Sequence, residues 1–437
     1  NRWGSEMSDI KAIVGGRLID GNSGAPVDDS VVVIEGKRIR AVGRRGGVEV
    51  PSGAEVIDAS GKTVMPGLIE AHTHPLGERS LEPGLRKYYD NMVSSPALPL
   101  LKGVEVLRKL LRRGITTVRI LHGAIPSAPE MRGEWLVALR TAVERGYFPA
   151  PRVVAAGCVF PTAGHMQFMS PRSVMKPGWR GADGVAEVRR QVRECLLENV
   201  DVVKLLGPTG GGGGGLDGPK VQGMSLEEIQ VAVEESHWKG VMVSAHAHGG
   251  PGLRAAVEGG VDTLEHGTWL YEQPDMVQMM VERGIYFVPT MGPRFHPVYS
   301  DYEKAKAGEL DEETTERVLG AADAIRRSLR MAHEAGVKIA AGTDFMRWDL
   351  SPLAWEIYIY VREGGLTPME ALVSATKTAA EACGLKDVGT VEEGKIADII
   401  VVDGDPLEDI AVLQDEEKIL HVFNAGMHSV KDGRINW

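Results

Sequence analysis

Six residues in this sequence have the side chains and the spacing to hold metal ions. They are His72, His74, Lys204, His246, His266 and Asp344, and each lies in or just after an apolar segment. Because side chains alternate along a β-strand, histidines at positions i and i+2 point both imidazoles to the same face. Imidazoles that converge with an acidic residue form a site for a borderline metal such as zinc. The six residues therefore predict a metal centre.

Lys204 is the unusual member of this set, because an ammonium group does not bind a metal ion. Burial near cations lowers the pKa of a lysine. The neutral amine can then take up carbon dioxide as a carbamate, whose two oxygens can bridge two metal ions. A lysine that faces the substrate or forms a salt bridge is the alternative. We expect the carbamate, and zinc is the expected metal.

The elements that position these residues follow a repeated pattern. Seven times between residues 113 and 337, a helical pattern ends in Gly or Asn and is followed by an apolar run. Gly or Asn closes a helix in the left-handed conformation, and the run that follows reads as a buried strand. The predicted strands include residues 115–118, 153–156, 202–206, 241–245, 287–288 and 338–341.

Strands that alternate with helices over this length predict a (β/α)8 barrel, also called a TIM barrel. An open, doubly wound sheet is the alternative, but no Gly-rich dinucleotide-binding motif follows the first strand. In a barrel the C-terminal ends of all strands converge on one mouth. The six candidate ligands lie on the first, fourth, fifth, sixth and eighth predicted strands, so this fold would bring them together.

The two ends of the chain carry short β patterns instead of alternating strands and helices. These lie at residues 11–18, 30–35, 38–42, 399–402, 419–424 and 428–430. Asp432-Gly433 is typical of a hairpin turn. We expect both ends to pair into a small β-sandwich beside the barrel. The predicted units are residues 9–65 and 386–437 for the sandwich and 66–385 for the barrel.

The composition excludes some classes of partner. With 437 residues, 43% of them hydrophobic and 25% charged, the chain is typical of a globular protein with a large core. A net charge of −11 argues against nucleic acids and anionic membranes as partners. Three scattered cysteines favour a reduced, cytoplasmic protein. We expect a small-molecule substrate, no membrane span and a homo-oligomer.

The motifs that carry these residues resemble the amidohydrolase superfamily. They are His72-Thr-His74 after Met-Pro-Gly, Val203-Lys204, His246-Ala-His248-Gly, Glu265-His266-Gly and Gly342-Thr-Asp344. Within the superfamily, the chain resembles the branch of metal-dependent prolidases, arginine carboxypeptidases and imidazolonepropionase-like enzymes. The resemblance implies a binuclear centre in which His72, His74 and Asp344 hold one ion. His246 and His266 would hold the other, with carboxylated Lys204 between the two.

A centre of this kind predicts hydrolysis of a carbon–nitrogen bond. Two cations stabilise a bridging hydroxide, since a single zinc ion already lowers the pKa of its bound water to about 7. The hydroxide would attack the scissile carbonyl. Asp344 would take the proton of the water and deliver it to the leaving nitrogen, first as general base and then as general acid.

Two further histidines are expected to bind the substrate. His165 matches the position of a Gly-His pair that contacts substrate in the prolidase-like branch. His248 shares the inward face of its strand with His246. Several dipeptidase relatives carry Tyr at the position of His248, so the chain departs from the dipeptidase pattern there.

Bulky apolar residues and a glycine run follow the predicted strands. Trp269, Met291 and Phe295 are among the apolar residues, and they fit a pocket for a large hydrophobic substrate, with packing between the barrel and its loops as the alternative. The glycine run 210–215 is expected to line this pocket. The predicted substrate is a dipeptide or an N-acyl amino acid with a bulky apolar part. The alternatives are a hydrolase of carbamates, ureas or cyclic amides and an inactive binding scaffold, which the complete ligand set disfavours.

Overall fold

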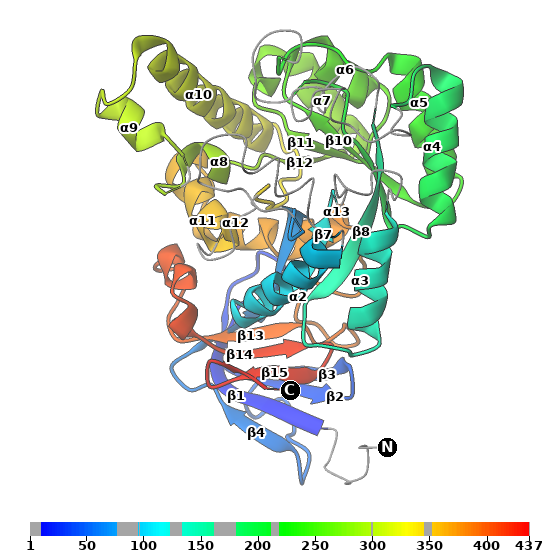
Figure 1. Ribbon diagram of the computed structural model, residues 1–437. Helices are drawn as coiled ribbons and strands as arrows, with labels where there is room; N and C mark the ends of the chain where they lie inside the picture. Colours follow the sequence, from blue (N-terminus) through cyan, green and yellow to red (C-terminus); the bar gives the residue numbers. More distant parts are fainter. Residues whose placement is uncertain are drawn as a thin grey trace.

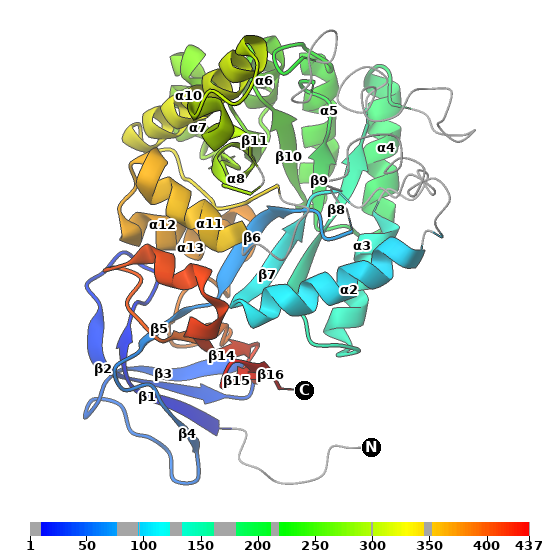
Figure 2. The ribbon, with the colours of Figure 1, turned by 60° about the vertical axis from the view of Figure 1, so that its left-hand side comes forward.

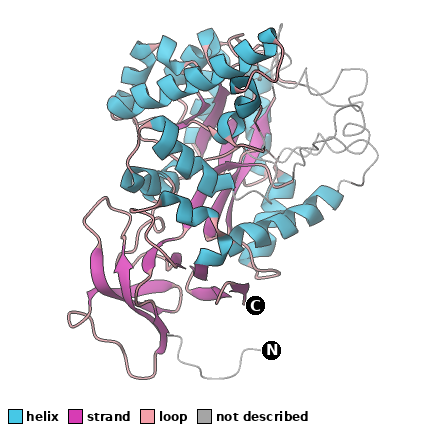
Figure 3. Cartoon of the chain, turned by 90° about the vertical axis from the view of Figure 1, so that its left-hand side faces the viewer, coloured by secondary structure: helices cyan, strands magenta, loops and turns pink. Residues whose placement is uncertain are grey.

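The protein consists of a helix-covered barrel and a separate sheet that both ends of the chain build (Figure 1). The computed structural model describes residues 10–76, 95, 97–122, 133–160, 181–210, 218–298, 300–344 and 352–436. Helices surround the strands of the barrel, and the terminal sheet lies at one end of it (Figure 3). The predicted barrel with an appended β unit is confirmed.

The barrel contains a seven-stranded parallel sheet. In spatial order its strands are β6 (Leu68–Thr73), β7 (Ile115–Ile120), β8 (Arg152–Val159), β9 (Val202–Leu205), β10 (Met242–Ala247), β11 (Thr263–His266) and β12 (Tyr286–Val288). Figure 2 shows β6 to β10 side by side. Nearly all residues of these strands are buried, because helices cover the outer face and side chains fill the interior.

An irregular segment closes the barrel where the eighth strand was predicted. Residues 338–341 form an isolated bridge instead of a regular strand. On one side the Ala340 amide donates to the Phe287 carbonyl of β12 at 2.9 Å. On the other side the Ala71 amide of β6 donates to the Ala341 carbonyl at 3.0 Å. The segment thus occupies the place of the eighth strand and connects β12 to β6.

The helices end where the sequence predicted. Those that follow the barrel strands include α2 (Ala97–Arg112), α3 (Glu134–Glu144), α4 (Val185–Leu197), α5 (Leu226–His237), α6 (Gly250–Glu258), α7 (Pro274–Arg283), α10 (Glu312–Glu334) and α11 (Pro352–Ile359). The predicted closing residues all have φ between 60° and 86°: Gly114, Gly146, Asn199, Gly240, Gly260, Gly284 and Gly336. Among the described residues, no helix combines the length and the apolar character that a bilayer span requires.

The terminal sheet joins the two ends of the chain. Its strands are β1 (Ile10–Leu18), β2 (Val27–Glu35), β3 (Arg38–Arg44), β4 (Glu55–Asp58), β5 (Thr63–Pro66), β13 (Ile399–Val402), β14 (Ile419–Asn424), β15 (Met427–Lys431) and β16 (Arg434–Ile435). β13 pairs antiparallel with β5, and a core cluster that includes Ile13, Val32 and Phe423 draws on both ends. Asp432 and Gly433, with φ of 48° and 71°, form the predicted turn between β15 and β16.

Candidate metal centre

Three of the predicted ligands form a first group at the end of β6. His72 lies in β6, His74 follows it, and Asp344 lies beside them because its amide donates to the His72 carbonyl at 2.8 Å. The Asp344 carboxylate Oδ1 is 2.9 Å from His74 Nε2 and 3.5 Å from His72 Nε2. One ligand atom of each residue lies within 4.8 Å of the others. This first group has the donors and the spacing to hold one metal ion.

A second group of three imidazoles lies at the ends of β10 and β11. It consists of His246, His248 and His266, with one ligand nitrogen of each within 4.8 Å of the others. The Thr290 hydroxyl is 2.8 Å from His266 Nδ1, and the Thr268 hydroxyl is 2.8 Å from His248 Nδ1. Sequence reasoning placed His246 and His266 here, whereas it placed His248 against the substrate. The geometry makes His248 a third candidate ligand of this second group.

The two groups meet around Lys204. The rings of His72 and His266 are 5.0 Å apart between centroids, and Lys204 extends from β9, which pairs with β10. Its side chain is 1% exposed, and among the described residues its Nζ has no hydrogen-bond partner. Burial lowers the pKa of Lys204 to about 8. A buried amine without a partner is costly, and carboxylation would convert it into an oxygen ligand, so this residue fits a metal centre.

Two of the buried imidazoles, His72 and His266, are set to be neutral. Burial lowers the pKa of His72 to about 4, and the charge of Lys204 adds to this effect. The pKa of His266 lies well below its usual value, first because of burial and then because of His246 and His248. A neutral ring offers a lone pair to a metal ion, whereas an imidazolium ring does not. These two rings can therefore act as metal ligands at neutral pH.

A buried ion pair beneath the first group was not predicted from the sequence. The Glu265 carboxylate, next to His266 in β11, lies 2.7 Å from His72 Nδ1 and accepts a hydrogen bond from Arg119 Nη2 at 2.9 Å. Burial by itself would raise the pKa of Glu265, but the charge of Arg119 and the hydrogen bond with His72 outweigh it and hold this pKa below its usual range. The available signal was one charge of each sign beside a predicted buried position, Arg119 directly after residues 115–118 and Glu265 directly before His266, since buried charges must pair.

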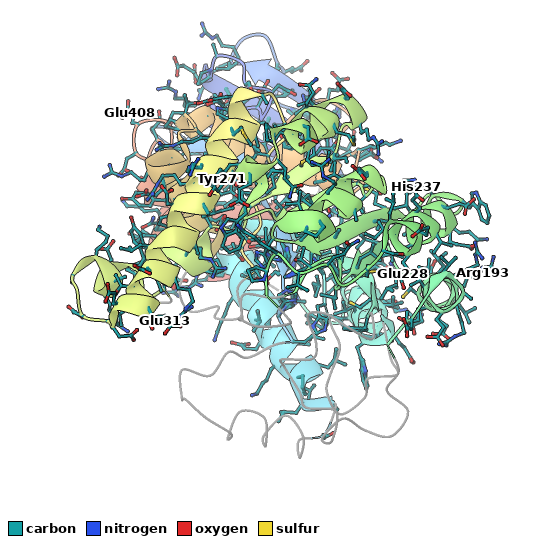
Figure 4. The ribbon with its side chains drawn as sticks, turned by 90° about the horizontal axis from the view of Figure 1, so that it is seen from above. Arg193, Glu228, His237, Tyr271, Glu313 and Glu408 are labelled. Carbon is teal, nitrogen blue, oxygen red and sulfur yellow. The ribbon has the colours of Figure 1, made fainter. Side chains whose placement is uncertain are left out.

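Other histidines lie away from this centre. His237, at the end of α5, forms an ion pair with Asp262 at 2.8 Å and is exposed at the outer edge of the barrel (Figure 4). His421 and His428 face each other in β14 and β15, with 3.1 Å between Nδ1 and Nε2. These histidines therefore belong to the outer surface and to the terminal sheet.

Part of the predicted pocket can be located. The Trp269 ring is T-shaped to His248 at 6.3 Å, and the Gly210 carbonyl is 3.2 Å from His246 Nε2, so both border the second group. Met291 and Phe295 instead belong to the main hydrophobic cluster and are 0% and 8% exposed. His165 and glycines 211–215 lie outside the described residues.

Comparison with known proteins identifies the family of this chain. The sequence profile described as the Amidohydrolase family matches residues 63–428. Ochratoxinase from Aspergillus niger is 30% identical over 97% of this chain and 87% of its own length. Its crystal structure has a TM-score of 0.83 at 29% identity and covers 97% of this chain and 96% of the other.

Two further solved structures are similar over nearly the whole chain. A prolidase complexed with N-methylphosphonate-L-proline has a TM-score of 0.81 at 30% identity and covers 97% of this chain and 100% of the other. Phenylurea hydrolase B has a TM-score of 0.75 at 25% identity and covers 96% of each chain. This chain therefore belongs to the amidohydrolase family and is a hydrolase that acts on carbon–nitrogen bonds.

Proposed function

We propose that this hydrolase cleaves the amide bond of an N-acyl amino acid or dipeptide with a bulky apolar part, at a binuclear metal centre. One observation carries the proposal: two groups of candidate ligands meet at one end of the barrel, around a buried lysine amine that has no partner among the described residues. The proposed ligands are His72, His74, Lys204, His246, His266 and Asp344.

The first group would hold one ion, and His246 and His266 would hold the other. Lys204, as a carbamate, would supply an oxygen to each, and zinc is the proposed metal because imidazole and carboxylate ligands suit it. When bound, such ions polarise a substrate carbonyl and lower the pKa of a coordinated water. His248, whose ring stacks on His266 at 21°, would face the substrate, and His165 has the same proposed role.

Asp344 is the proposed proton carrier. Its carboxylate is 33% exposed, so it can reach both a water molecule and a substrate in the mouth. The Oδ1 atom would accept a proton from the attacking water as the new carbon–oxygen bond forms. It would then give this proton to the amide nitrogen as the carbon–nitrogen bond breaks. Without that proton an amine is a poor leaving group, so the transfer matters most for amides.

The relatives favour amides of amino acids over other carbon–nitrogen substrates. The prolidase structure contains N-methylphosphonate-L-proline, an N-substituted amino acid, and this chain is 30% identical to that protein. Trp269, beside the second group, supplies an apolar surface for a bulky substrate. The likeness to phenylurea hydrolase B at 25% identity supports a second candidate function, the hydrolysis of a urea or carbamate.

A substrate panel separates these functions. Zinc-loaded protein would be assayed on dipeptides, N-acyl amino acids, aryl amides, carbamates and ureas, with Asp344→Asn as the matched blank. We expect cleavage of N-acyl amino acids or dipeptides that carry a large apolar group and a free α-carboxylate. Cleavage restricted to neutral ureas or carbamates would replace the first function with the second. Bound metal with no turnover on any substrate would contradict both.

A further inference from the structure

We propose that Glu265, held by Arg119, is a positioning residue that sets the tautomer of His72 before any metal binds. The inference rests on the proposed function only in taking His72 as a metal ligand. It assigns the ion pair below the first group a role in preparing that group for its ion.

The Glu265 carboxylate is fixed in orientation by its contacts. Its Oε1 accepts hydrogen bonds from three groups, which are Arg119 Nη2 at 2.9 Å, the Ser244 hydroxyl at 2.7 Å and the Thr263 hydroxyl at 2.6 Å. These bonds leave Oε2 directed at His72 Nδ1, 2.7 Å away. Glu265 is 0% exposed and His72 is 1% exposed, so water does not compete for these bonds.

Arg119 holds both the carboxylate and the backbone next to His72. Its Nε donates to the Ala71 carbonyl at 2.6 Å, and Nη1 donates to the Ala382 carbonyl at 2.9 Å and to the Thr263 hydroxyl at 3.3 Å. Ala71 directly precedes His72, so one guanidinium fixes the main chain and the partner of the ring together. The positive charge also balances the buried carboxylate, which alone would be strongly disfavoured.

This arrangement decides which ring nitrogen of His72 carries a proton. An ionised carboxylate can only accept a hydrogen bond, so His72 Nδ1 must donate. The lone pair of the neutral ring then lies on Nε2. Nε2 is the atom that lies 3.5 Å from Asp344 Oδ1, on the side where the first group converges. Glu265 therefore turns the metal-binding nitrogen of His72 toward the proposed ion.

Glu265→Gln tests this role directly. A glutamine amide can donate as well as accept, so it no longer dictates the proton position on His72. Loss of a partner behind a metal-bound histidine weakens metal binding by about 10- to 100-fold. We expect this loss for one of two zinc ions in competition with a chelator, and little change for the other. Thr263→Val is the matched control, because it removes a bond to Oε1 and leaves the Glu265–His72 contact in place.

The ion pair also contributes to folding, so a second variant is needed. Glu265→Gln leaves Arg119 without its counter-charge and can fail to fold. The double variant Arg119→Met/Glu265→Leu removes both charges, and apolar replacement of a buried pair is often tolerated. If this folded double variant bound both zinc ions as tightly as the wild type, the ion pair would be purely structural and the proposal would be wrong.

A measurement that needs neither metal nor turnover tests this proposal independently of the proposed function. In metal-free wild-type protein, nitrogen NMR of labelled histidines should show His72 protonated on Nδ1, and Glu265→Gln should shift part of the signal to the other tautomer. Wild-type His72 protonated on Nε2 would overturn the proposal even in an active enzyme. An inactive enzyme with Nδ1-protonated His72 would refute the function alone.

Discussion

The two groups of candidate ligands lie side by side in the barrel mouth, yet the chain supports them in different ways. In the first group, His72 is held by the carboxylate of Glu265, which a buried guanidinium neutralises. In the second group, His266 and His248 are held by the hydroxyls of Thr290 and Thr268, each at 2.8 Å. One side of the centre is supported by ionised groups and the other by neutral ones.

This difference affects both binding strength and cost. A hydrogen bond to a charged partner contributes about 1.5–3 kcal/mol, whereas one between neutral groups contributes about 0.5–1.5 kcal/mol. The buried Glu265 carboxylate needs a cation beside it in the core, and the fully buried Arg119 is that cation. The first group also contains Asp344, the proposed proton carrier. We therefore expect substitutions on the first side to have the larger effects.

The largest effect is expected at Asp344. Asp344→Asn keeps the size of the side chain and an oxygen that can bind a cation, but it removes the site that accepts and returns the proton. General acid–base groups contribute about 10²- to 10⁴-fold to the rate, so kcat should fall by about 10³-fold. Metal analysis of the same sample should show most of the metal retained. Turnover within about tenfold of the wild type would exclude Asp344 as the proton carrier.

Lys204, between the two groups, should affect both sides at once. Lys204→Ala removes the proposed carbamate, so the protein should bind less of both metal ions. Because metal ligands are lost, kcat should also fall by about 10²-fold or more. Short carboxylic acids fit the vacated space and should restore part of the activity. Full metal content and full rate in Lys204→Ala would contradict the bridging role.

The same lysine should destabilise the protein when no metal or carbon dioxide is bound. Burial lowers its pKa from 10.5 to about 8 in the folded state, which corresponds to about 3 kcal/mol of destabilisation. This penalty is fully present below pH 8, where the folded and unfolded forms are both protonated. It is lost as the pH rises from about 8 through 10.5, and above this pH both forms are neutral.

Lys204→Met in metal-free, carbon dioxide-depleted buffer tests this sign. Urea unfolding at pH 7 should show the variant to be more stable than the wild type by about 3 kcal/mol. The gap should shrink at pH 10. A wild type that is as stable as the variant at pH 7 would mean that Lys204 is stabilised by an unidentified partner.

The sequence indicated where the candidate ligands converge, but it did not indicate the residues that support them. The shared face of His72 and His74 follows from strand alternation, and their convergence with Lys204 and Asp344 follows from the common mouth of a barrel. Glu265 and Arg119 are adjacent only in the folded barrel, on β11 and β7, and strand periodicity does not indicate such long-range pairs. The irregular backbone at 338–341 was not predicted for a similar reason, because its backbone hydrogen bonds go to β12 and β6.

The smallest effects are expected on the neutral side of the centre. Thr290→Val keeps the shape of the side chain and removes the hydroxyl that lies against His266 Nδ1. The loss of one neutral hydrogen bond should weaken zinc binding by about 2- to 12-fold, less than Glu265→Gln on the charged side. Thr268→Val, beside His248, is the matched control and should change zinc affinity less still if His248 faces the substrate. Chelator competition measures all three variants. An equal loss of zinc affinity in Thr268→Val and Thr290→Val would instead make His248 a ligand of the second ion. A larger loss of zinc affinity in Thr290→Val than in Glu265→Gln would reverse the ranking of the two sides.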